Sequence, residues 1–307
     1  MCPSGGPRRL AVALLLALGA AWPADAAAQA CCGASGLVIP ARLRVYDDYG
    51  FGVQATERQT YGSLAADGTY STTSTGDLVT EQDLFAMARL SSRVQLALLV
   101  PYVETYRRIP GQSQWGGFFG DVTVNGRFEV AHTGEHGRWP ALTILAGLTA
   151  PTGRAPDQAH DALGTDAAGT GSFQVNVGLE VERLFQQWFV TFDGWVSKRT
   201  SRASPGGRQS FAPRLTALLA GGFVFTNRLA VGAFATVIDE GNGHDTAPGA
   251  GDVAGPRYAT AGLAGAVPLD ESWRLQATAS ADLPLGGWGR NQPTTLGIGT
   301  SLVRVWP

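Results

Sequence analysis

Residues 173–198 alternate apolar and polar side chains with a period of two, and this pattern constrains the fold more than any other feature. In residues 173–181 one parity is wholly apolar, namely Phe173, Val175, Val177, Leu179 and Val181. After a short break the alternation resumes at residues 188–198. Because side chains alternate faces along a strand, the segment predicts a hairpin with one apolar and one polar face. Each limb has about ten residues, which suits a tilted strand crossing a bilayer, although a half-buried soluble sheet would alternate in the same way.

Similar segments follow one another along the chain, and the connections between them alternate in length. The predicted strands are residues 46–61, 78–90, 94–102, 122–130, 142–148, 173–183, 188–198, 214–225, 228–239, 257–268, 273–283 and 294–306. The long connections are residues 62–77, 110–119, 153–171, 200–210, 241–256 and 286–293, and the short ones are residues 91–92, 132–139, 185–187, 226–227 and 270–272. Long external loops and short periplasmic turns are typical of outer-membrane barrels, whereas a sandwich has no reason to gather every long loop at one end. The sequence therefore predicts an all-β, transmembrane antiparallel up-and-down β-barrel of about 12 strands.

The N-terminus predicts export from the cytoplasm. Residues 1–30 combine a basic pair, an apolar stretch at residues 10–20 and an A-x-A sequence ending at Ala30, which is the pattern of a cleaved signal peptide. Residues 31–42 are then a short N-terminal periplasmic segment that could line the barrel mouth or enter it, and residues 43–307 form the barrel. We therefore expect the protein in the outer membrane of a Gram-negative bacterium.

Composition and motifs argue against several other functions. With 41 Gly and 2 Met the chain is poor in helix-forming residues, and a net charge of −2 gives no basic excess for nucleic acid. The 4 His lie in predicted loops and turns, in no arrangement typical of a catalytic triad or a metal site. We expect no enzyme activity, no metal and no cofactor, and an outer-membrane hydrolase is the less favoured alternative. Acylation of Cys31 is left open.

Charged and amide side chains inside the predicted strands lie mostly on the parity opposite the apolar one. Since a lipid-facing Arg near the midplane costs about 2–4 kcal/mol, these residues should face the lumen and are the candidate pore-lining residues. They are Arg93, Arg107, Asp121, Arg127, Glu129, Asn176, Glu180, Glu182, Asp193, Arg274 and Asp282. Because both signs of charge occur, the set could either close the lumen with salt bridges or line a narrow aqueous pore.

Aromatic residues lie near the ends of the predicted strands, as expected for interfacial girdles. Those beside short turns are Trp139, Trp188, Trp273 and Trp306. Those nearer the long loops are Tyr102, Tyr106, Trp195 and Trp288. The pattern predicts a ring of aromatic side chains at each membrane interface.

Two strand motifs resemble a known family. Residues 120–127 match a G-D-x-x-x-x-x-R strand, and residues 148–153 match an L-x-x-P-T-G strand end. The chain here resembles the outer-membrane β-barrel transporters related to the MetA-pathway phenol-degradation channel proteins. The resemblance implies an outer-membrane channel for small, often hydrophobic compounds. The chain departs from the usual terminal Phe, because it ends in Trp306 and Pro307.

Together these features predict a channel that lets small solutes, hydrophobic or aromatic ones among them, cross the outer membrane passively. The expected partners are outer-membrane lipid, the barrel assembly machinery and the small-molecule solutes, with no nucleic acid. A non-conducting structural or adhesive barrel is the alternative, because the pattern does not decide whether the lumen is open.

Overall fold

The computed structural model describes residues 42–43, 46–72, 76–132, 139–204, 206–226, 228–249 and 251–307. The predicted signal peptide, nearly all of the predicted periplasmic segment and most of the predicted turn at residues 132–139 lie outside these ranges. Within them, no helix is long and apolar enough to cross a membrane.

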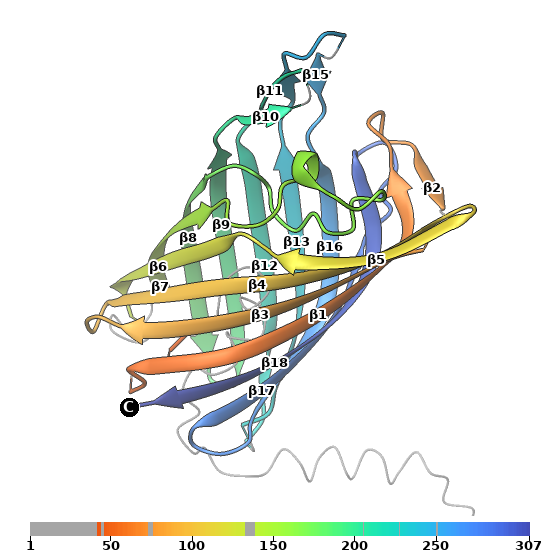
Figure 1. The fold of residues 1–307 in the computed structure, drawn as a ribbon. Helices are drawn as coiled ribbons and strands as arrows, with labels where there is room; N and C mark the ends of the chain where they lie inside the picture. Colours follow the sequence, from red (N-terminus) through yellow and green to blue (C-terminus); the bar gives the residue numbers. More distant parts are fainter. Residues whose placement is uncertain are drawn as a thin grey trace, which may run out of the picture.

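Twelve antiparallel strands form a closed β-barrel, so the predicted fold class is confirmed (Figure 1). In ring order they are β1 (Tyr49–Leu64), β3 (Asp77–Arg89), β4 (Val94–Ile109), β6 (Val122–Ala131), β7 (Ala141–Ala150), β8 (Gln174–Phe185), β9 (Trp188–Arg199), β12 (Arg214–Val224), β13 (Ala230–Glu240), β16 (Arg257–Pro268), β17 (Trp273–Asp282) and β18 (Gln292–Trp306). The ring closes where β18 pairs with β1 from Tyr49 opposite Trp306 to Leu64 opposite Gln292. Closure leaves no unpaired edge around the ring, as a strand-built structure in lipid requires.

The barrel is apolar outside and polar inside. On β8, Val177 is 55% exposed and Leu179 is 51% exposed, whereas the alternating Glu182 is 1% exposed. A soluble sheet would bury the apolar parity and expose the charged one. The inverted pattern fits a wall with lipid outside, and it confirms the faces that the period of two predicts.

The long connections contain more regular structure than the sequence predicts. The prediction of a loop at residues 110–119 is wrong, because β5 (Gln112–Phe119) forms a hairpin with the outer half of β4. Short strands also occur in three other predicted loops: β2 (Tyr70–Thr72), β10 (Arg202–Ser204) with β11 (Gly207–Ser210), and β14 (Gly243–Asp245) with β15 (Asp252–Val253). The last four form a small separate sheet at the upper end of the barrel in Figure 1. The Gly, Ser and Asp residues of these segments indicate exposure to water. They do not prevent the exposed backbone from forming hydrogen-bonded strand pairs.

Part of the lumen wall is apolar, which the alternation of charge does not predict. Near the end with the short turns, which is the predicted periplasmic end, Leu43, Phe85, Met87, Val303 and Val305 form a buried cluster. Room for it comes from glycines on β1: a Cβ on Gly52 would lie 2.4 Å from the ring of Phe85. Further around the ring, two more clusters face inward from β9, β12 and β13. They are Phe189, Val224 and Ala230, and Leu218, Ala220 and Phe234.

Candidate functional site

The lumen holds three features: a polar network at its periplasmic end, a neutral cavity towards its outer end and a loop at the mouth. The strands fix the height of each side chain along the barrel axis. β6 and β8 run from the end with the long loops towards the end with the short turns, and β7 and β9 run in the opposite direction. Lumen-facing residues of neighbouring strands therefore meet at matched heights.

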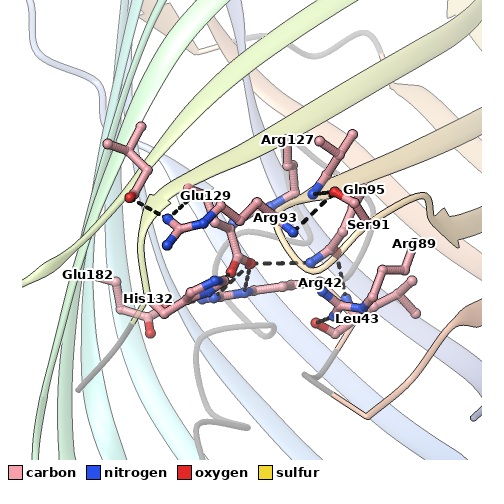
Figure 2. A network of polar contacts seen from close by, with 12 residues as sticks. Arg42, Leu43, Arg89, Ser91, Arg93, Gln95, Arg127, Glu129, His132 and Glu182 are labelled. Atoms are coloured by element: carbon pink, nitrogen blue, oxygen red, sulfur yellow. Dashed lines mark hydrogen bonds and ion pairs between the residues drawn. The ribbon is translucent and has the colours of Figure 1, made fainter. Parts of the chain in front are cut away.

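Arg42 lies at the centre of the network (Figure 2). Its Nη2 is 2.9 Å and its Nε 3.2 Å from Oε1 of Glu129, and its Nη1 is 3.3 Å from Oε2 of Glu182. These carboxylates are 2% and 1% exposed, and they come from β6 and β8. Gln95 donates to the same Glu129 oxygen at 3.2 Å, and His132 Nδ1 contacts the other oxygen. The guanidinium thus joins two walls of the lumen.

The backbone that follows Arg42 is held inside the same end. The Leu43 N–H donates to Oε1 of Gln95 at 3.1 Å, and Arg89 Nη2 donates to the Leu43 carbonyl at 3.2 Å. Arg89 Nε also donates to the carbonyl of Asp47, whose carboxylate pairs with Arg274. Side chains from strands β3, β4 and β17 therefore all bind the described part of residues 42–48 through hydrogen bonds or an ion pair. We call this part of the chain, residues 42–43 and 46–48, the N-terminal latch.

A second charged layer lies nearer the outside. Arg127 and Glu180 form a buried ion pair, and Asp193 lies opposite Glu180 in the pairing of β8 with β9. Among the described residues, neither carboxylate oxygen of Asp193 has a hydrogen-bond donor, and Nε and Nη1 of Arg127 have no acceptor. Such buried groups require water or a solute as partner.

Outside this layer is a cavity of about 320 Å³. We call it the outer chamber. Its lining residues are Thr123, Asn125, Thr149, Gln174, Asn176, Trp195, Ser197, Arg214, Thr216, Thr236 and Ile238. They project from β6, β7, β8, β9, β12 and β13, so the chamber lies within the ring.

The loop between β7 and β8 is tied to the mouth of the barrel. Asp121 accepts hydrogen bonds from the Gly153 N–H at 2.9 Å and from the Thr170 N–H and hydroxyl, each at 2.7 Å. On the other side Arg107 donates to the carbonyl of Leu163 at 2.7 Å. The loop, with its short turn η1 (Pro156–Gln158), lies at the upper end of the barrel in Figure 1.

Asp166 holds this loop together from within. Arg154 pairs with its carboxylate and also lies 4.1 Å above the ring of Phe118. Burial opposes ionisation of Asp166, but the N–H groups of His160 and Asp161 and the Arg154 guanidinium outweigh that effect. They hold the pKa of Asp166 at about 2, below its usual range.

Nine of the eleven predicted pore-lining residues are buried inside the barrel or at its mouth. They are Asp121, Arg127, Glu129, Asn176, Glu180, Glu182, Asp193, Arg274 and Asp282. Arg93 precedes β4 and donates to the backbone carbonyls of Glu129 and Val130. Arg107 lies on the outer half of β4, which pairs with β5 instead of the ring neighbour β6. That these residues line a conducting path stays a prediction.

Trp195 and Arg42 also lie in the lumen, although neither is among the predicted pore-lining residues. The prediction that Trp195 belongs to the outer girdle is wrong, because its side chain is 7% exposed and lines the outer chamber. Its parity matches Asp193 and Ser197, so the alternation could have placed it inside. Arg42 belongs to the predicted periplasmic segment, for which the sequence leaves open whether it lines the barrel mouth or enters it; its guanidinium pairs with lumen carboxylates. By contrast Trp139 and Trp188 project outward at the periplasmic end, as predicted.

Within the described ranges, no group of three or more His, Cys, Asp or Glu side chains is arranged to hold a metal.

Comparisons with known proteins support the fold. No protein-family model matches the sequence, and no curated protein matches it. Among solved structures, the COG4313 outer membrane channel from Pseudomonas putida F1 is similar with a TM-score of 0.71 at 15% identity, over 86% of this chain and 97% of that one. The transport unit of the autotransporter AIDA-I from Escherichia coli gives a TM-score of 0.52 at 7% identity, over 89% and 95%. The translocator domain of the autotransporter NalP from Neisseria meningitidis gives 0.50 at 12%, over 97% and 96%.

Proposed function

We propose that this protein is an outer-membrane channel of a Gram-negative bacterium that lets small solutes pass by diffusion. The observation that carries the proposal is the outer chamber, a polar cavity enclosed by a ring of strands whose outer surface is apolar. A structural barrel has no need of a solvent-sized cavity inside its wall. The similarity in fold to the COG4313 outer membrane channel supports the same reading.

In this proposal the N-terminal latch is a seal. Its ion pairs with Glu129 and Glu182 and its place in the apolar cluster around Leu43 support a closed state of the channel. Passage to the periplasm then requires the latch to leave the lumen. Export through a cleaved signal peptide, insertion by the barrel assembly machinery and contact with outer-membrane lipid belong to the same proposal. No catalytic residue and no nucleic-acid partner are part of it.

A non-conducting structural or adhesive barrel is the second candidate, and the ion pairs that hold the N-terminal latch inside the barrel are the observation that favours it. Single-channel recording in planar bilayers separates the two. For the channel we expect brief openings of the wild-type protein and longer ones when Arg42 is replaced by Ala. Absence of current from both proteins, after both have been shown to be folded by their heat-modifiable migration on gels, would leave the structural barrel as the better assignment.

A further inference from the structure

The outer chamber is lined mainly by uncharged polar side chains. Eight of its eleven lining residues carry a hydroxyl or a carboxamide. They are Thr123, Asn125, Thr149, Gln174, Asn176, Ser197, Thr216 and Thr236. The remaining three are Trp195, Arg214 and Ile238. Hydrogen-bonding groups therefore face the cavity from six strands.

Two glycines shape the chamber by leaving space for these side chains. A Cβ on Gly147 would lie 2.4 Å from Oδ1 of Asn125 and 3.2 Å from Nδ2 of Asn176. A Cβ on Gly178 would lie 2.7 Å from Cδ2 of Trp195. The two amides thus meet over Gly147 and the indole lies over Gly178. The positions of these side chains therefore depend on the two glycines, because a methyl group at either position would displace the amides or the indole.

The polar groups of the chamber have capacity left for a ligand. The indole N–H of Trp195 is buried, and in the described part of the chain it has no acceptor. The amides and hydroxyls make few bonds among themselves: Gln174 donates to Asn176 Oδ1 at 2.7 Å, and the Thr123 and Thr149 hydroxyls are 3.0 Å apart. Each hydroxyl and carboxamide can form more than one further bond.

The chamber lining is mostly uncharged. Arg214 is its one charged residue, and its Nε lies 2.8 Å from Oε2 of Glu240, a carboxylate that it shares with Arg199. The layer below contains two carboxyl groups, Glu180 and Asp193, beside the single guanidinium of Arg127, which pairs with Glu180, so it holds no excess of positive charge. A wholly apolar solute would bury the amides and hydroxyls without partners, which a polar site penalises strongly.

We infer that the outer chamber binds uncharged, polyhydroxylated solutes of about the size of a monosaccharide. A ring of donors and acceptors suits a ligand that offers many hydroxyls, and a cavity of this volume is at the small end of ligand pockets. The inference rests on the proposed channel function and narrows its substrate class. It differs from the hydrophobic compounds that the resemblance of the sequence implies.

The test is ligand-observed saturation-transfer NMR on the detergent-folded full chain, with glucose, gluconate and toluene as probes. We expect saturable binding of glucose, and weaker binding of gluconate and toluene. Trp195→Phe removes the unpaired N–H while keeping an aromatic ring, and should weaken glucose binding about fivefold, as expected for one lost hydrogen bond. Gly178→Ala, which displaces the indole, should weaken it as well. Trp288→Phe is the matched control, because Trp288 lies outside the chamber lining and should leave binding unchanged.

Equal glucose binding in the wild-type and Trp195→Phe proteins would overturn the inference, as would tighter binding of toluene than of glucose. Single-channel current is recorded separately on the same samples. Current without glucose binding refutes the inference and leaves the channel function intact. Glucose binding without current, in the wild-type protein and in Arg42→Ala, supports the chamber as a binding site and refutes the channel.

Discussion

Replacing Arg42 with Ala should open the periplasmic seal. The guanidinium makes three hydrogen bonds to two carboxylates that are almost fully buried, and its own side chain is 14% exposed. A hydrogen bond to a charged group contributes about 1.5–3 kcal/mol, but lumen water can hydrate the freed carboxylates in the open state. We therefore assign about 2 kcal/mol to the whole side chain, less than the sum of its bonds.

That energy corresponds to a change of about 30-fold in the ratio of open to sealed channels. A channel that is open for about 1% of the time would then be open for about a quarter of it. Leu43 and Asp47 still hold the latch in Arg42→Ala, so we expect longer and more frequent openings and not a permanently open pore. The assay is open probability in planar bilayers, measured over many single channels.

Arg183→Ala provides the control. Arg183 is the neighbour of Glu182 on β8 but projects outward, over the ring of Phe185 at 4.7 Å. Its loss removes the same charge at the same end without touching the lumen. If Arg42→Ala and Arg183→Ala both leave the open probability at the wild-type value while the channel conducts, the latch is not the seal. An equal rise in both would mean that charge at this end, and not the latch, controls opening.

Three further predictions concern the lumen charge, the lipid face and the mouth. Glu180→Gln removes a buried carboxylate and leaves Arg127 without its partner, so the reversal potential in a KCl gradient should move towards that of chloride; an unchanged potential would mean that ions do not pass Glu180. Leu179→Arg puts a charge on the lipid face and should lower the free energy of unfolding in bilayers by about 2–4 kcal/mol, whereas Asn176→Ser on the inner face should change it little; equal effects would contradict the orientation of β8. The Asp166 carboxylate, with its pKa of about 2, accepts the N–H groups of His160 and Asp161. Because this pKa is depressed, the bonds should be intact above about pH 4 and lost as pH falls through about 2, which amide hydrogen exchange corrected for its intrinsic pH dependence would detect. Protection that does not fall at low pH would show that the carboxylate does not hold the loop.

The sequence by itself determined the barrel and which face of each strand points outward. A period of two is a local property, so the sequence of each strand indicates by itself which face points outward. Val177 and Glu180 lie on the faces that this period predicts. The alternation of long and short connections distinguishes the two ends of the barrel. Even Trp195 follows the parity of its strand: it is buried like Asp193 and Ser197, and its aromatic ring does not decide which face it occupies.

Only the tertiary structure decided how the lumen is filled. Arg42 is 87 residues from Glu129 and 140 from Glu182 along the chain, and no local pattern links partners so far apart. The apolar cluster around Leu43 depends on space left by Gly50 and Gly52, which appear in the sequence as ordinary small residues of a polar face. Closing the ring brings inner faces from all the strands together. The alternation along a strand determines which face of the barrel a side chain occupies, and closure of the ring determines which side chains of other strands it contacts.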